Sequence, residues 1–158
     1  MIGVGLALAA GSTMAGPSAC GLPEATGSRE LHQVLSLRAV ELVRRAADTN
    51  DRQAALVSPS ASFNLGAGDV GRPLGTGVDG ARQLARTMNA DTYRFLGWDF
   101  MDAPANACSE HKIEIEFMDT RAKVLSRVEF TFEAGRVVSA AGWQRSFQTG
   151  RIQDAPAH

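Results

Sequence analysis

The last third of this 158-residue chain most constrains its fold, because apolar and polar side chains alternate there over consecutive segments. Residues 112–117 and 127–132 both alternate with a period of two, which is the pattern of strands with one buried and one wet face. Between the second segment and a returning strand over 136–147 lies a three-residue loop whose Gly135 can adopt a left-handed conformation. We therefore expect an antiparallel meander at the C-terminal end of the domain.

Helical patterns dominate the part of the chain before the meander. The serine-proline pair at Pro59 should end the second helix, and Asp79 is placed to cap the third. Helices followed by antiparallel strands indicate an α+β fold and not the alternating order of a parallel sheet. The expected elements are helices over 28–48, 51–57 and 81–88, strands over 61–65 and 92–98, and a loop over 99–110.

The segment 64–81 contains the pattern Gly-x-Gly-x-x-Gly twice, which by itself suggests a nucleotide site. A dinucleotide fingerprint needs a strand before the glycines and a helix directly after them. The first copy runs into Pro73 and opens no helix, while the second opens a helix but has only Pro73 and Leu74 before it, where we expect no strand. We interpret the glycines as turns and predict no cofactor.

Composition excludes several kinds of partner. The net charge is −1 and the basic residues are spread along the chain, so the sequence has no electrostatic footprint for nucleic acid or anionic lipid. Neither cysteine has a second cysteine or a histidine at metal-ligand spacing, so we predict no metal site. The length fits a single domain.

The N-terminal residues 1–19 are uncharged and apolar, which predicts a signal peptide cleaved between residues 15 and 19, although a basic n-region is missing. The apolar run is too short and too rich in glycine to span a bilayer. We therefore expect a periplasmic or secreted protein.

The sequence leaves three interpretations of the two cysteines open. In an oxidising compartment Cys20 and Cys108 could form a disulfide that ties the N-terminal arm to the loop before the meander. Two unpaired thiols are the second alternative. Lipidation of Cys20 ranks third, because Pro17, Ser18 and Ala19 lack the aliphatic residue that a lipoprotein signal carries three positions before its cysteine.

Two stretches resemble the nuclear-transport-factor-2-like superfamily of cone-shaped α+β domains, which includes ketosteroid isomerases and SnoaL-like cyclases. Residues 56–84 combine a helix end, a proline turn, the short strand ASFNL and a glycine-rich helix start; residues 130–139 read FTFEAGRVVS, like the isomerases' Phe-x-Phe hairpin. The resemblance covers 28–151 and implies a cone of helices on a curved, mostly antiparallel sheet. The remaining chain is then an arm over 20–27 and a disordered tail over 152–158.

The resemblance assigns three catalytic roles, and this chain leaves all of them empty. The position of the isomerases' carboxylate base is Leu65, and that of their carboxylic-acid donor is Val128. The only tyrosine, Tyr93, lies outside the first helix, where the family's oxyanion tyrosine would sit. A ketosteroid isomerase of the known type is therefore not expected.

A cone of this kind holds a pocket on its concave face. Strand alternation also predicts Phe63, Phe117, Phe130 and Phe132 as core residues. The catalytic candidates are Tyr93, Asp99 and His111, with His111 more readily read as an exposed residue at a strand start. Candidate pocket residues are Phe63, Tyr93, Trp98, Asp99, Phe117, Trp143 and Arg145.

These observations favour an exported small-molecule-binding or accessory domain without an evident catalytic set. The first alternative is a SnoaL-like isomerase, cyclase or dehydratase that acts on a hydrophobic small molecule with a different polar set, drawn from Tyr93, Asp99, His111 and Arg145. The second is a homodimeric assembly module, which an exposed apolar stripe on the outer sheet face would favour.

Overall fold

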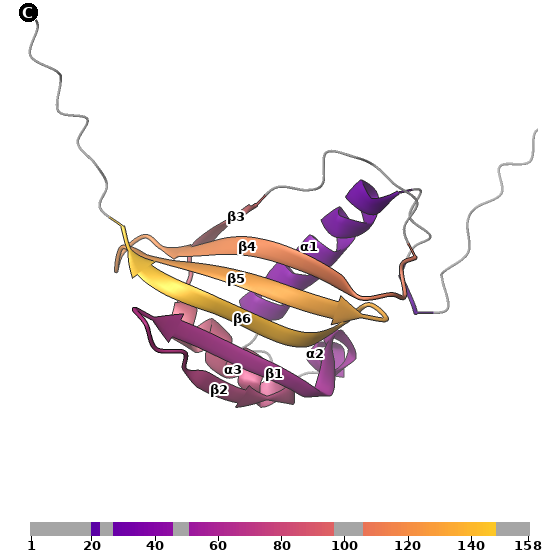
Figure 1. Cartoon of the computed structure of the whole chain (residues 1–158), viewed down its shortest axis with the longest axis horizontal. Helices are drawn as coiled ribbons and strands as arrows, with labels where there is room; N and C mark the ends of the chain where they lie inside the picture. Colours follow the sequence, from indigo (N-terminus) through magenta and orange to yellow (C-terminus); the bar gives the residue numbers. More distant parts are fainter. Residues whose placement is uncertain (1–19, 23–26, 46–50, 97–105, 148–158) are drawn as a thin grey trace, which may run out of the picture.

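The computed structural model describes residues 20–22, 27–45, 51–96 and 106–147 (Figure 1). The predicted signal peptide and C-terminal tail lie outside these residues. Helices and strands follow in the order α1 (Ser28–Arg44), α2 (Asp51–Leu56), β1 (Val57–Ala67), β2 (Pro73–Thr76), α3 (Gly77–Met88), β3 (Thr92–Phe95), β4 (His111–Asp119), β5 (Val124–Glu133) and β6 (Arg136–Ser146).

The strands form one curved sheet in the order β2-β1-β6-β5-β4-β3, and the helices lie on one side of it (Figure 1). All neighbours are antiparallel except β1 and β6, which are parallel. The predicted meander is therefore confirmed as β4, β5 and β6, and so is the α+β fold with helices packed on a mostly antiparallel sheet.

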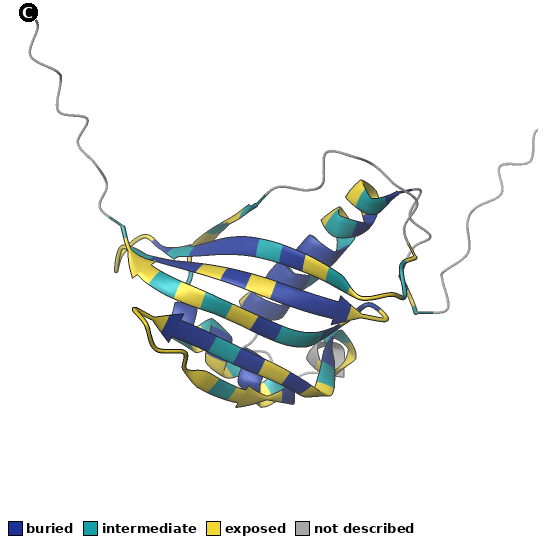
Figure 2. Cartoon of the chain, viewed as in Figure 1, coloured by how far each residue is buried: buried dark blue, intermediate teal, exposed yellow. Residues whose placement is uncertain are grey.

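The core lies between the helices and the inner face of the sheet. One cross-strand row runs Phe63, Ala140, Phe130, Ile113, and all four side chains are buried. Burying a side chain of the size of phenylalanine or isoleucine stabilises the fold by about 1.5–3 kcal/mol. The alternation of buried and exposed residues along β5 and β6 is visible in Figure 2, and the four phenylalanines predicted as core are all buried.

Helix α1 covers this core with a stripe of apolar residues at helical spacing. Leu31, Leu35 and Leu42 are buried, whereas Leu37 on the opposite side is 51% exposed. Of the helix expected over 28–48, α1 accounts for Ser28–Arg44, and residues 46–50 lie outside the described part of the chain.

Strand β1 corrects the prediction that Pro59 separates a helix from a short strand at 61–65. It extends over Val57–Ala67, and its register with β6 is irregular between Val57 and Ser62. Proline has no amide hydrogen and is tolerated at such irregularities, and Pro59 here is exposed. The local rule failed because tertiary pairing with β6 decided the structure.

The glycine-rich segment also departs from its prediction. Residues Pro73–Thr76, where no strand was expected, form β2 and pair antiparallel with β1. Helix α3 begins earlier than predicted, at Gly77, and Asp79 does not cap it but pairs with Arg82 at 3.0 Å. The two glycine patterns are thus a hairpin turn and a helix start, as the turn interpretation requires.

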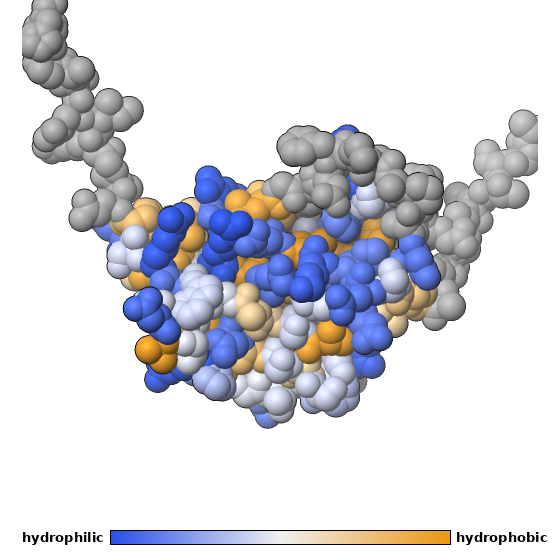
Figure 3. Space-filling model, viewed as in Figure 1, coloured by the Kyte–Doolittle hydropathy of each residue, from blue (hydrophilic) through white to orange (hydrophobic). Residues whose placement is uncertain are grey.

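The outer face of the sheet is dominated by cross-strand ion pairs. Glu116 is nearly fully buried, and the guanidinium of Arg94 binds its carboxylate at 2.5 Å. Arg127 donates two hydrogen bonds, from Nε and Nη2, to the carboxylate of Glu114. Figure 3 shows hydrophilic residues spread over this face. Within the described residues it therefore has no continuous apolar stripe of the kind that a dimer interface would use. None of the helices described has the length and apolar character needed to cross a membrane.

Candidate pocket at the open end of the cone

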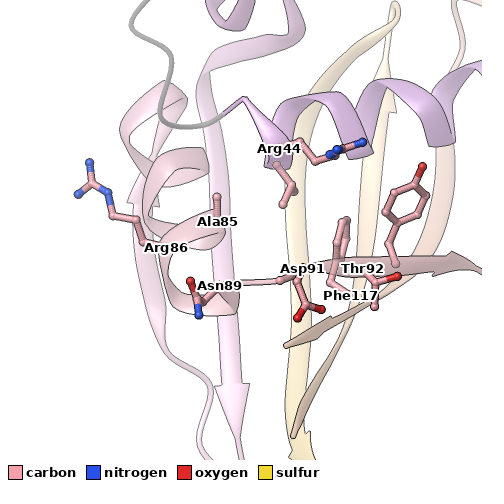
Figure 4. Close-up of a pocket in the computed structure, with 10 residues that line it drawn as sticks. Arg44, Ala85, Arg86, Asn89, Asp91, Thr92 and Phe117 are labelled. Carbon is pink, nitrogen blue, oxygen red and sulfur yellow. The ribbon is translucent and has the colours of Figure 1, made fainter. Parts of the chain in front are cut away.

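A pocket of about 470 Å³ opens where the C-terminal ends of α1 and α3 meet β3 (Figure 4). Pockets that bind small molecules fall in this range of volume. The residues that line it are Val43, Arg44, Ala85, Arg86, Asn89, Ala90, Asp91, Thr92, Tyr93 and Phe117.

Aromatic rings form the apolar wall of the pocket. The register of β3 and β4 places Tyr93 opposite Phe117 on the inner face, with ring centroids 6.5 Å apart. The ring centroids of Tyr93 and Phe95 are 5.4 Å apart, and those of Phe117 and Phe130 are 6.2 Å apart. Each ring packs against its neighbours at a tilted or edge-on angle, so the apolar wall is preformed.

Asn89 is a pocket residue whose polar group is already engaged. It ends α3 in the left-handed conformation, with φ of 46°, and its amide donates to the Asp119 carboxylate at 2.8 Å. Asp119 also accepts the backbone N–H groups of Ala122 at 2.8 Å and Arg121 at 3.0 Å. The hydrogen bond from Ala122, followed by that from Asn89, lowers the pKa of Asp119. This group closes the β4–β5 turn onto the end of α3.

Asp91 is engaged in the same way. Its carboxylate accepts the hydroxyl of Thr120 at 2.5 Å and the backbone N–H of the same residue at 3.3 Å. Both Asp91 and Asn89 therefore have a structural task at the turn, and neither is a free group awaiting a ligand.

Arg44 and Tyr93 differ from these two. Within the described residues, neither the Arg44 guanidinium nor the Tyr93 hydroxyl has a hydrogen bond or ion pair. Both also line a second, adjacent hollow of about 580 Å³, together with Leu37, Val40, Glu41 and Arg45 of α1. In Figure 4 the Arg44 side chain extends from α1 above Phe117, whereas that of Arg86 points away from the other labelled residues. Arg44 and Tyr93 thus stand at the junction of two hollows.

Several residues predicted to line the pocket lie elsewhere. Phe63 is 2% exposed and belongs to the core. Trp143 and Arg145 are on the outer face, because β6 places Trp143 opposite Arg127 and Arg145 opposite Leu125. These are corrections. Of the predicted set, Tyr93 and Phe117 do line the pocket, and Trp98 and Asp99 lie outside the described residues.

The catalytic candidates are not brought together. His111 opens β4, and its Nε2 lies 2.8 Å from the carbonyl oxygen of Asn106 and 3.1 Å from the hydroxyl of Ser109. Tyr93 pairs with the other end of the same strand, at Phe117. Six residues of extended chain separate the two positions, which is about 20 Å. His111 and Tyr93 therefore cannot act on one reacting atom.

The two isomerase positions are neighbours in space but have no polar group. Leu65 pairs with Gly142, and Gly142 pairs with Val128, so all three share one row on the inner face. Leu65 is 2% exposed and Val128 is fully buried. The row where the resemblance places a base and an acid is thus part of the apolar core.

The opposite end of the cone is closed by the N-terminal arm. Cys20 and Cys108 form a disulfide with their Cα atoms 5.6 Å apart. Leu22 follows and is fully buried against Gly135 of the β5–β6 hairpin. Arg38 of α1 donates to the carbonyl oxygens of Gly135 at 2.9 Å and Gly21 at 3.1 Å. Burial lowers the pKa of Arg38.

Sequence reasoning missed Arg44, Ala85 and Asn89. A basic residue in the last turn of a helix and an asparagine directly after one are ordinary helix-end signals, so nothing marked them as pocket residues. No group of three or more histidine, cysteine, aspartate or glutamate side chains in the described segments is arranged to hold a metal ion.

No protein-family model matches the chain, and no curated protein matches its sequence. Solved structures resemble its fold. A candidate ketosteroid isomerase from Kribbella flavida is 12% identical, and the match covers 85% of this chain and 93% of the other at a TM-score of 0.48. A cystatin-like protein of unknown function from Methylobium petroleophilum is 17% identical, with coverage of 82% and 85% and a TM-score of 0.45.

An NTF2-like protein of unknown function from Cytophaga hutchinsonii is 8% identical, with coverage of 72% and 89% and a TM-score of 0.42. At these identities the likeness concerns the fold alone. The described residues have the architecture that the sequence resemblance implied, with helices on one face of a curved, mostly antiparallel six-stranded sheet.

Proposed function

We propose that this protein is an exported domain that binds a small, largely apolar molecule in the pocket between α1, α3 and β3. The observation that carries the proposal is the pocket itself, which joins a preformed aromatic wall to polar groups without partners among the described residues. These groups are Arg44, Arg86, Thr92 and Tyr93, of which Arg86 points away from the other labelled residues in Figure 4. Binding sites combine an apolar lining with a few directed polar groups in this way.

Binding is favoured over catalysis because the polar groups at the pocket either bond to other residues of the fold or have no second catalytic group within reach among the described residues. A general acid or base must lie within hydrogen-bond reach of the atom it serves. His111 is at the far end of β4, and the carboxylates of Asp91 and Asp119 hold the β4–β5 turn. Tyr93 is the one catalytic candidate of the sequence that borders the pocket in the described structure.

Export is supported by the bond between Cys20 and Cys108, since disulfides persist mainly in oxidising compartments. The uncharged apolar run over 1–19 agrees with this. Fractionation of the native host, with detection of the mature chain, tests the proposal. Recovery of a full-length, reduced chain from the cytosol would contradict export.

Filling the pocket tests binding. Ala85 of α3 lines the pocket and is labelled in Figure 4, so Ala85→Phe should weaken binding of a neutral aromatic probe, 2-naphthamide, by at least about tenfold in calorimetry. Gln83→Phe adds the same ring to an exposed position of the same helix and serves as the control. Circular dichroism reports whether each variant folds, and Ala90→Leu is a smaller filling change. Equal affinity of Ala85→Phe and the wild type would refute this site.

A further inference from the structure

We propose that the ligand carries a carboxylate, which Arg44 binds through two parallel hydrogen bonds while the apolar body of the ligand lies against Phe117 and Tyr93. This inference rests on the proposed binding function and specifies the chemical class of its ligand. Some polar groups around the pocket bond to other residues of the fold, and others have no partner among the described residues.

The acidic residues Glu41 and Asp91 line the same hollows as Arg44 but bond to other residues. Glu41, one turn earlier in α1, pairs with Arg45 at 3.6 Å. Asp91 gives its carboxylate oxygens to the hydroxyl and the N–H of Thr120. Each of these two acids therefore bonds to a residue other than Arg44, and within the described structure the guanidinium remains without an acceptor. A guanidinium carries only donors, so the group that completes it must be an acceptor.

The two hollows meet at Arg44 and Tyr93, which line both of them. Arg44 lines both hollows, which places its guanidinium at their junction instead of deep in either one. Tyr93 lines the same two hollows, and its ring is held by packing on Phe95 and Phe117. A planar carboxylate satisfies the two-pronged donor set of arginine, and a phenol hydroxyl beside it can donate a further hydrogen bond.

The charges around the pocket determine whether it attracts anions from a distance. The C-terminal ends of α1 and α3 both face the pocket and each adds partial negative charge of about half an elementary unit. Arg44 and Arg86 add two positive charges to the lining and Asp91 adds one negative charge, so with the two helix ends the net charge at the pocket is close to zero and no diffuse positive field attracts anions to it. Recognition of an acid must come from the directed bond to Arg44, so removing that single guanidinium should remove the preference for an acid.

The apolar part of the ligand follows from the remaining lining. Val43, Ala85 and Ala90 complete the wall begun by the two aromatic rings. A volume of about 470 Å³ accommodates a fused-ring or branched aliphatic body. The chemical class is thus an aromatic or aliphatic carboxylic acid with one acidic end.

The test compares two probes of nearly equal shape, 2-naphthoate and 2-naphthamide, by calorimetry on the full chain. Wild type should bind the naphthoate at least about tenfold more tightly than the naphthamide. Arg44→Met should abolish this preference while changing naphthamide binding much less. Arg44→Lys should restore only part of it, because an ammonium group cannot make the two-pronged contact. Tyr93→Phe should reduce the preference without abolishing it.

Arg82→Met is the control, because it removes one positive charge from α3 at a residue whose partner is Asp79 and which borders neither hollow. Its preference should equal that of wild type. Binding of both probes with equal affinity by wild type, or a preference that survives Arg44→Met, overturns the inference and leaves the binding function intact. Failure of both probes to bind overturns the binding function together with the inference.

Discussion

Two arginines of helix α1, Arg38 and Arg44, differ in whether the fold gives them a partner. Toward the disulfide end, Arg38 is part-buried and donates to two backbone carbonyl oxygens, which belong to Gly21 and Gly135. Arg44, less than two turns later, is exposed and has no partner among the described residues. One end of the domain is closed by the disulfide, the buried Leu22 and the hydrogen-bonded Arg38. The other end is open at the pocket, where Arg44 has no partner among the described residues.

This difference indicates a division of labour along one helix. Polar groups that fasten the fold are satisfied within it, as at Arg38, Asp91 and Asp119. An exposed group without an internal partner at a hollow, such as Arg44, is free to bond to water or to the proposed ligand. The two ends should then respond independently to substitution, with stability changing at the closed end and ligand affinity at the open end.

The largest expected effect comes from breaking the disulfide. Cys20 and Cys108 are separated by 88 residues in sequence, and loss of a crosslink over such a loop should lower the free energy of unfolding by about 4 kcal/mol. Urea denaturation of wild type with and without reductant measures the change. Cys20→Ser/Cys108→Ser should match the reduced wild type, respond to no reductant and bind 2-naphthamide as before. An oxidised protein no more stable than the reduced one would break the comparison.

Removing the leucine plug should have the next largest effect. Leu22→Ala leaves a cavity between the arm and the β5–β6 hairpin, and such truncations of buried leucine cost about 2–5 kcal/mol. Leu37→Ala truncates the same side chain at an exposed position of α1 and should cost no more than about 0.5 kcal/mol. Thermal and chemical unfolding of the two variants with the disulfide intact give the values. Equal losses would mean that Leu22 does not seal the core.

The two arginines give the most direct comparison of the ends. Arg38→Met leaves two carbonyl oxygens without their donor and should lower the free energy of unfolding by about 2 kcal/mol. Arg44→Met removes no internal bond and should change it by less than about 0.5 kcal/mol. Methionine preserves the helix propensity and much of the stem in both cases. A large loss of stability in Arg44→Met would show that this arginine serves the fold and not a ligand.

The architecture was predictable where the sequence repeats a pattern many times. The alternation over 112–117 and 127–132 repeats often enough to identify strands and their buried faces, and the order of helices before strands identifies the fold class. Single-residue rules did worse. Pro59 sits inside β1 and Asp79 does not cap α3, because pairing with β6 and the φ values of Gly75 and Gly77 determine the backbone there.

The site was predictable only in part, for a reason that Trp143 illustrates. Strand β6 is rich in small residues around it, so its own alternation does not show which face is buried. Only the register with β5, where Val128 opposes Gly142, places the tryptophan outside. Arg44 could not be recognised as a pocket residue from the sequence, because its context is that of an ordinary helix end. Its lack of a partner among the described residues is visible only in the folded structure.

The smallest effect concerns Asp119 at the rim of the open end. The N–H of Ala122 and the amide of Asn89 hold the pKa of Asp119 below its ordinary value. Because the folded-state pKa is the lower one, the stabilisation is complete above the unfolded-state value of about 4 and is lost as the pH falls through the folded-state pKa. Wild type should therefore exceed Asp119→Asn in stability near neutral pH, and the gap should narrow in acid. Asn89→Gly keeps the left-handed backbone but removes the amide donor, so it should show part of the same narrowing. A gap that is the same at neutral and acid pH would mean that the charge of Asp119 does not hold the turn, and the open end would then rest on packing alone.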